Sequence, residues 1–173
     1  VVQVVEEMNP QSTHLLGMGN IHQCYAQRQG NKLKCWGNGS GGAVPTSQGV
    51  NVGEQVGEMG DNLQYSDVGT SVTPIEIKSG GYFNCVLFSN DKLKCFGQGS
   101  SGRLLQGSSS HFGDEVGEMG DTLPFLDFGS GRTVKDYAIN YVAGCAILDN
   151  DLLKCWGQNS YGALGNEGGG HLV

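Results

Sequence analysis

Six cysteines are the residues of this chain whose type and spacing most clearly indicate chemistry. They fall in three copies of one phrase that recurs about every sixty residues. In each copy a short β-favouring run, a turn and an alternating polar–apolar run predict a β-hairpin. Folding such a hairpin about its turn, for example about Asn90, places the two cysteines opposite each other, within the ~4.5 Å Cα separation that suits a disulfide. The sequence therefore predicts three disulfides: Cys24–Cys35, Cys85–Cys95 and Cys145–Cys155.

Two other interpretations of the cysteines have less support. Six buried free thiols would require every cysteine to fall across a hairpin by chance, and zinc would require closer spacing or a histidine that recurs with the pairs. Each disulfide closes a loop of about ten residues and should stabilise its hairpin by ~2–3 kcal/mol. Because structural disulfides persist in oxidising compartments, the pairs predict an extracellular or cell-surface protein.

An acidic phrase, VGEMGD, follows the same period and ends at Asp61 and again at Asp121. Carboxylates on glycine-rich loops can bind calcium, which makes Glu58, Asp61, Glu118 and Asp121 candidate ligands. The alternative is a solvated loop whose acids cap turns, and the phrase lacks the ligand order of an EF-hand. Calcium is the only cofactor that the sequence suggests.

Two further features sit just after the hairpins. Asn38-Gly39-Ser40 is an N-glycosylation sequon, which makes Asn38 a possible acceptor. Trp36, Phe96 and Trp156 each precede a glycine at the same point of the repeat. They could form a ligand-facing aromatic ring, but packing between repeats explains their recurrence more simply.

No catalytic motif accompanies these features. The four histidines fall at unrelated points of the repeat: His14, His22, His111 and His171. There is no nucleophile elbow and no phosphate-binding loop. We therefore expect a protein that is not an enzyme.

Composition excludes further classes. The net charge of −7 argues against nucleic acid, which attracts a basic surface. The longest apolar runs span four or five residues, whereas a membrane-spanning helix needs ~20. Thirty glycines lie between short apolar runs, which is typical of an all-β protein with many tight turns.

The elements that must hold these residues form a repeating unit of roughly four short antiparallel strands and one long loop. Before each hairpin we expect approach strands at 1–5, at 66–69 with 74–77, and at 125–129 with 134–138. Four strands in about sixty residues predict a β-propeller blade. The units divide one propeller-like domain into 1–60, 61–120 and a truncated 121–173.

The third copy, residues 145–165, reads CAILDNDLLKCWGQNSYGALG and resembles the repeat of the regulator of chromosome condensation family. The other copies are looser, since Arg103-Leu104-Leu105 and Ala43-Val44-Pro45 replace its Ala-Leu-Gly. The resemblance implies a propeller, normally of seven blades, and the paired cysteines look like a secreted or cell-surface branch. Three units cannot close a ring. We therefore expect a partial propeller or an open stack, which is either a fragment or a protomer completed by neighbouring copies.

Two functions remain in competition. The first is an extracellular structural or binding module with protein partners, copies of itself included, that assembles head-to-tail into a ring or filament. The second, implied by the family resemblance, is a guanine-nucleotide exchange factor for a small GTPase. That role belongs to reducing compartments, where structural disulfides rarely persist. A hydrolase, the third class, has no supporting motif.

Overall fold

Ten short strands form three antiparallel sheets in the computed structural model, which describes residues 15–27, 31–46 and 48–166. Sheets A, B and C follow one another along the chain, and hydrogen-bonded neighbours run β1-β2-β3-β4, β5-β6-β7 and β10-β9-β8. The strands are β1 (Leu15–Met18), β2 (His22–Gln27), β3 (Lys32–Gly37) and β4 (Ser66–Asp67) in sheet A; β5 (Pro74–Ser79), β6 (Phe83–Phe88) and β7 (Leu93–Gly97) in sheet B; and β8 (Val134–Ile139), β9 (Ala143–Leu148) and β10 (Leu153–Gly157) in sheet C.

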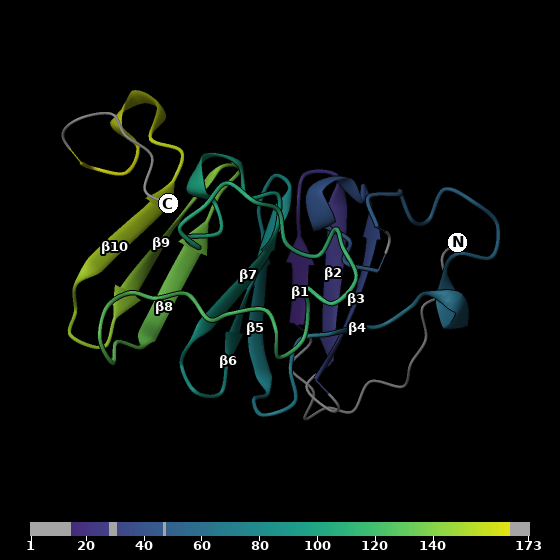
Figure 1. Cartoon of the computed structure of the whole chain (residues 1–173), viewed down its shortest axis with the longest axis horizontal. Coiled ribbons are helices and arrows are strands. Elements are labelled where there is room, and N and C mark those ends of the chain that lie inside the picture. The colour runs from purple at the N-terminus through teal and green to yellow at the C-terminus, as the bar shows by residue number, and fades with distance from the viewer. Residues whose placement is uncertain (1–14, 28–30, 47, 167–173) are drawn as a thin grey trace.

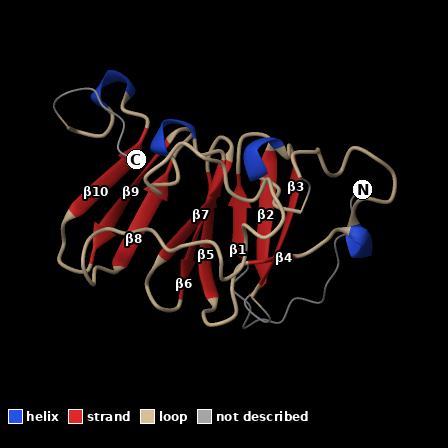
Figure 2. Ribbon diagram, viewed as in Figure 1, coloured by secondary structure: helices blue, strands red, loops and turns tan. Residues whose placement is uncertain are grey.

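The three sheets stand side by side in chain order, with sheet B between the other two (Figure 1). Four 3-10 turns complete the described structure: η1 (Ser40–Gly42), η2 (Gly60–Asn62), η3 (Ser100–Gly102) and η4 (Ser160–Gly162). Three of them lie at one end of the strands, η1, η3 and η4, and long loops run across the sheets (Figure 2). No helix within the described ranges is long and apolar enough to cross a membrane.

Each sheet has two distinct faces because side chains alternate along a strand. We call the face that carries the disulfide the cysteine face. The opposite face, which carries Trp36, Phe96 or Trp156, is the aromatic face. The cysteine face of sheet A packs on the aromatic face of sheet B, and one apolar cluster fills that junction. A second cluster joins the cysteine face of sheet B to the aromatic face of sheet C. All six positions of β6 are consequently buried.

The hairpins have the predicted register. Cys24 pairs with Cys35, Cys85 with Cys95 and Cys145 with Cys155 across their hairpins. Each turn includes an Asn or Asp in the left-handed region, a conformation that these residues tolerate best after glycine. Their φ angles are 52°, 57° and 64° for Asn31, Asp91 and Asp151.

The prediction of four strands per unit holds for sheet A, whereas sheets B and C have three. In sheet B the backbone N–H of Leu126 donates to the carbonyl of Leu93 at 2.8 Å, where Ser66 pairs with Leu33 in sheet A. A single hydrogen bond does not form a strand pair, so sheet B has no fourth strand. The predicted approach strand at 1–5 lies outside the described residues, and the strand that pairs with β2 is β1.

The junction between sheets A and B should depend strongly on Phe96, which is fully buried in it. Replacing Phe96 by alanine leaves a cavity, so we expect Phe96→Ala to lower the free energy of unfolding by about 3–5 kcal/mol. Urea denaturation measures this loss. Val56→Ala, at a fully exposed loop position, is the control and should change stability by less than about 0.5 kcal/mol. Equal effects of the two variants would show that the junction does not depend on this ring.

Candidate functional site

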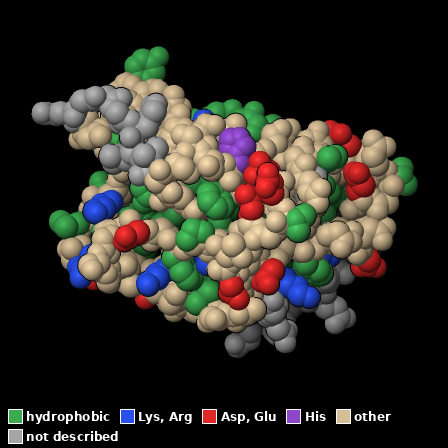
Figure 3. Space-filling view, viewed as in Figure 1, with side chains coloured by type: hydrophobic (Ala, Val, Ile, Leu, Met, Phe, Trp, Pro, Cys, Tyr) green, Lys and Arg blue, Asp and Glu red, His purple; other side chains and the backbone are tan. Residues whose placement is uncertain are grey.

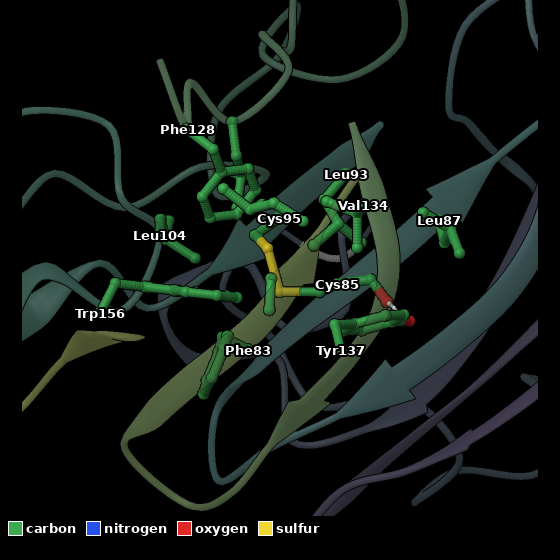
Figure 4. Close-up of a cluster of buried hydrophobic side chains, with 13 residues drawn as sticks. Phe83, Cys85, Leu87, Leu93, Cys95, Leu104, Phe128, Val134, Tyr137 and Trp156 are labelled. Carbon is green, nitrogen blue, oxygen red and sulfur yellow. Dashed lines mark hydrogen bonds between the residues drawn. A yellow bond between two sulfur atoms is a disulfide. The ribbon is translucent and has the colours of Figure 1, made fainter. Parts of the chain in front are cut away.

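The three predicted disulfides are present in the structure. The paired Cα atoms lie 4.1, 4.1 and 4.0 Å apart, as expected for opposed residues of an antiparallel hairpin. The Cys85–Cys95 bridge lies among Phe83, Leu93 and Trp156 in the core between sheets B and C (Figure 4). The bridge of sheet A is buried in the same way, whereas Cys145 and Cys155 are half-buried because no described element covers the cysteine face of sheet C.

Two of the three recurring aromatic residues point toward the preceding sheet. Phe96 is buried against sheet A, and Trp156 is buried against sheet B. The Trp156 Nε1–H donates to the carbonyl of Arg103 at 2.9 Å. Trp36 occupies the same position in sheet A and is half-buried on an aromatic face that no described sheet covers.

A lysine that the sequence interpretation missed connects sheet B to the segment that follows sheet A. Lys94 is 3% exposed, and its ammonium donates to the carbonyls of Val68 at 3.2 Å and Gly120 at 2.8 Å. It also lies 4.8 Å from the centroid of the Phe125 ring. Burial lowers the pKa of Lys94, and the charges of Asp121 and Asp67 oppose that shift. The lysine thus holds the segment that follows β4 of sheet A against the end of the acidic phrase at Gly120.

Asp121 completes this clasp between the two units. Its carboxylate accepts hydrogen bonds from the backbone N–H of Thr70 at 3.0 Å and from the Thr70 hydroxyl at 2.8 Å. The same two bonds lower the pKa of Asp121. Gly120 N–H also donates to the carbonyl of Asp67 at 3.1 Å. The acidic phrase therefore ties its own loop to the connector of the preceding unit.

A lysine stands immediately before the second cysteine of each hairpin, and this recurrence is the sequence signal from which the role of Lys94 could have been predicted. Lys154 donates to the carbonyl of Phe128 at 2.8 Å, the position that Val68 holds one unit earlier. Lys34 donates to the carbonyl of Gly60 at 3.3 Å and lies 4.4 Å from the centroid of the Tyr65 ring.

The glutamates of the acidic phrase organise their own loops. Glu58 accepts from the backbone N–H groups of Gly53 at 2.8 Å and Gln55 at 2.9 Å, and these bonds lower the pKa of Glu58. Glu118 likewise accepts from the backbone N–H groups of Gly113 at 2.8 Å and Glu115 at 3.0 Å. Asp61 lies in η2. In residues 15–27, 31–46 and 48–166, no three His, Cys, Asp or Glu side chains gather closely enough to hold a metal ion. The calcium hypothesis therefore has no ligand set in this part of the chain.

One group of acidic side chains gathers beside a histidine on the surface (Figure 3). His111 lines a shallow hollow with Ser109, Ser110, Asp114, Glu115 and Glu118. Its Nδ1 accepts from the backbone N–H of Gly99 at 3.2 Å. The imidazole thus fastens the loop to the end of β7.

Asn38, the candidate glycosylation site, is half-buried beside η1. Its side-chain oxygen accepts from the backbone N–H of Ser40 at 3.0 Å, and its own N–H donates to the carbonyl of Ile21 at 2.8 Å. The first of these bonds forms a local turn. Glycosylation of Asn38 stays a prediction.

A second missed residue, His22, is fully buried where sheet A meets sheet B. Its Nε2 lies 2.9 Å from Oδ1 of Asn84, whose amide nitrogen donates to the carbonyl of Ala43 at 3.1 Å. This orientation of the amide makes Nε2 the donor. Burial lowers the pKa of His22, and the bond to Asn84 partly offsets that effect. The imidazole is therefore held neutral in the folded chain.

The two ends of the stack expose apolar side chains. On the aromatic face of sheet A, Leu16 is 52% and Met18 is 63% exposed. On the cysteine face of sheet C, Ile147 is 41% and Leu153 is 65% exposed. Leu33 and Leu93 hold the position of Leu153 in the other two sheets, and both are fully buried. The faces at the two ends of the described stack therefore carry apolar side chains at positions that are buried inside the stack.

Comparison with known proteins identifies the fold. No protein-family profile matches the sequence. No curated protein sequence matches it either. The structure is similar to that of human WBSCR16, with a TM-score of 0.67 and 18% identity over 92% of this chain and 38% of that one. It is also similar to Prp20p from Saccharomyces cerevisiae, a protein studied for its binding to Gsp1p and histones, with a TM-score of 0.63 and 18% identity over 88% of this chain and 35% of that one.

The structure is similar, too, to that of yeast RCC1 (Prp20) bound to Kap60, with a TM-score of 0.63 and 19% identity over 91% of this chain and 35% of that one. These similarities show that the chain has the fold of propeller repeats of the regulator of chromosome condensation type. The predicted all-β fold is confirmed, as an open set of three sheets. The chain spans little more than a third of the length of the structures it matches.

The clasp should contribute measurably to stability. Lys94→Met removes two charge-assisted hydrogen bonds and leaves two buried carbonyls without a donor, so we expect a loss of about 1–3 kcal/mol in the free energy of unfolding. Lys135→Met is the matched control, because Lys135 forms only an exposed ion pair with Asp151, worth less than about 1 kcal/mol. Urea denaturation of both variants measures the difference, and equal losses would rule out a special role for Lys94.

The stability of the A–B junction should fall in mild acid. Below about pH 6.5 the unfolded chain binds a proton at His22, whereas the folded chain, with its lowered pKa, does not. Unfolding is then favoured by at most about 1.4 kcal/mol per pH unit until the folded-state pKa is reached. The measurement is urea denaturation from pH 8 to pH 5 on the wild type and on His22→Gln, which keeps a donor but does not titrate. Parallel pH profiles of the two proteins would contradict this role of His22.

Proposed function

We propose that this chain is a non-enzymatic extracellular module that acts by binding other proteins through propeller repeats stapled by disulfides. The observation that carries this proposal is the placement of the disulfides. Each disulfide crosslinks one hairpin. The cysteine faces of sheets A and B pack on the next sheet, and the cysteine face of sheet C is uncovered among the described residues.

The cysteines support an oxidising compartment. The disulfides account for all six cysteines of the sequence, and four of the sulfurs lie in inter-sheet cores: Cys24, Cys35, Cys85 and Cys95. A glycine-rich unit with a small core gains from such a crosslink, at ~2–3 kcal/mol for each short loop. Cytosolic and nuclear proteins rarely keep structural disulfides, which disfavours the exchange-factor alternative.

The exposed ends support a role in protein binding. Contiguous apolar side chains at a surface, rimmed by polar groups, are typical of protein interaction sites. Both ends of the described stack carry such side chains, Leu16 and Met18 on one and Ile147 and Leu153 on the other. The binding of Gsp1p and histones is a property of Prp20p, and the partial coverage gives no reason to assign those partners to this chain.

The proposal predicts three disulfides of unequal accessibility in the secreted protein. Peptide mapping without reduction should recover all three crosslinked pairs. Under a mild reductant in native buffer, Cys145–Cys155 should be reduced and alkylated first, because access of the attacking thiolate governs the rate and this pair is half-buried. Timed alkylation with mass spectrometry measures the order.

Unfolded protein is the control, because in it all three disulfides should react at similar rates. Six free thiols in secreted material would overturn the extracellular proposal. Preferential reduction of Cys24–Cys35 or Cys85–Cys95 would show that the packing of the cysteine faces differs from the one described here.

A further inference from the structure

A buried guanidinium at the junction of sheets B and C lacks a carboxylate partner in the described part of the chain. Arg103 follows η3 and is 9% exposed, and its carbonyl accepts the indole N–H of Trp156. In the described ranges the cations that form ion pairs are Lys78, Arg132 and Lys135. Removing a charge from water is costly unless a group of opposite charge compensates for it. The guanidinium of Arg103 is therefore a candidate binding group for an anion.

The hydrogen bonds of Arg103 leave one edge of its guanidinium unused. Nη1 donates to the side-chain oxygen of Gln98. Nε is buried without a hydrogen-bond partner, and Nη2 is neither buried in this way nor bonded to a described residue. The Nε–Nη2 edge presents two parallel N–H groups, the arrangement that binds both oxygens of a carboxylate. The unused edge therefore matches a carboxylate better than a single acceptor oxygen.

Two tyrosines lie beside this guanidinium. Tyr82 directly precedes β6 and Tyr141 lies in the turn before β9, and their rings meet edge-to-face with centroids 5.9 Å apart. Burial lowers the pKa of Arg103, and the groups that oppose this shift are Tyr141 and Tyr82 rather than a carboxylate. A hydrogen bond between the two tyrosine side chains raises the pKa of Tyr141. Because Tyr141 is 48% exposed, the cluster reaches the protein surface at this side chain.

Backbone contacts hold the parts of this cluster together. The Gly81 N–H donates to the carbonyl of Tyr141 at 3.1 Å, and a Cβ on Gly81 would lie 2.5 Å from that oxygen. The Gln98 N–H donates to the carbonyl of Tyr82 at 2.9 Å. The turns before β6 and β9 and the segment after β7 are therefore fixed relative to one another before a ligand arrives.

The packing of the repeats does not require this cluster. Ala43 and Ala163 hold the position of Arg103 in the other two units. At the A–B junction, Ile21 and Gly81 hold the positions of the two tyrosines. Sheets A and B pack through an apolar cluster without a buried arginine. Arg103 therefore has a role other than the stacking of sheets.

We propose that Arg103, Tyr82 and Tyr141 form a binding site for a carboxylate, the Asp or Glu side chain of a bound protein. This inference rests on the proposed function and names the chemical group that the partner presents. Nη2 and Nε donate to the two carboxylate oxygens, and the Tyr141 hydroxyl donates to one of them. Because Nε is buried in the free chain, the carboxylate meets Nη2 first, and the half-exposed Tyr141 is the member of the cluster with most freedom to move.

A protein is the better source of this carboxylate than a small free molecule. One ion pair contributes less than a free small ligand loses in translational freedom, whereas a protein surface adds further contacts around the same group. The partner therefore presents its acidic side chain at the end of the B–C junction where η3 lies (Figure 2).

The Nε–H resonance of Arg103 in proton–nitrogen NMR spectra tests the inference directly. The chain has three arginines, and the spectrum of Arg103→Lys assigns this signal by its loss. Titration with the capped tripeptide acetyl-Gly-Asp-Gly-amide should shift the signal downfield and saturate, because a charge-assisted hydrogen bond forms. The matched peptide acetyl-Gly-Asn-Gly-amide lacks the charge and should give no saturable shift. The signal of Arg132, which already pairs with Asp149 at 3.3 Å, is the internal control and should not move.

Variants compared through the indole N–H signal of Trp156, which donates to the carbonyl of Arg103, locate the binding. Arg103→Lys keeps the charge but loses the paired N–H groups, so the affinity for the aspartate peptide should fall by about tenfold or more. Tyr141→Phe keeps the ring of a half-exposed residue and removes its hydroxyl, and the affinity should fall by about three- to tenfold. Tyr161→Phe, at a fully exposed position on η4, is the matched control and should bind like the wild type.

An equal response to the two peptides, or no saturable response to the aspartate peptide, would overturn the inference. So would unchanged affinity in both Arg103→Lys and Tyr141→Phe. Acetate that binds as tightly as the aspartate peptide would overturn the protein as the source of the carboxylate. Each of these results with all three disulfides intact leaves the proposed function standing, whereas free thiols in secreted protein would overturn the proposed function itself.

Discussion

The structure depends on one repeated contact, the packing of a disulfide-bearing sheet face against the aromatic face of the next sheet. Each glycine-rich unit has too few apolar residues to form a core of its own, so its stability comes from its neighbour. The disulfide crosslinks the two strands of each hairpin at directly opposed positions. Phe96 and Trp156 then fill the two internal junctions. The contact requires only adjacent sheets, and sheet B, which has a neighbour on both sides, is buried on both of its faces.

Polar groups fix how one sheet is aligned on the next. Lys94, Asp121 and Thr70 fasten the loop of one unit to the connector of the unit before it. The same loop is folded by its own glutamate, Glu118, which bridges two backbone N–H groups. The acidic phrase therefore recurs with the hairpins because both belong to the same junction. Glu58, Glu118 and Asp121 accept hydrogen bonds from backbone N–H groups, which gives these recurring carboxylates a structural role.

The features that the sequence could predict are local. The hairpins and disulfides follow from residues within about a dozen positions, and the β-propeller repeat follows from their recurrence. The clasp could not be predicted, because the two carbonyls bound by Lys94 lie 26 residues away on either side and meet only when sheets stack. The strand Leu15–Met18 was missed because Gly17 and Gly19 give it the appearance of a loop, although a Cβ on Gly17 would lie only 2.3 Å from the Ser79 hydroxyl oxygen of sheet B. His22 was missed because its burial depends on Asn84, far away in the sequence.

Hydrogen–deuterium exchange tests the repeated contact most directly, since amide protection reports local opening. In dilute solution the strands of sheet B, covered on both faces, should exchange most slowly, and β9 and β10 of sheet C should exchange faster. Equal protection of all three sheets would contradict the claim that each sheet is stabilised by the face of its neighbour.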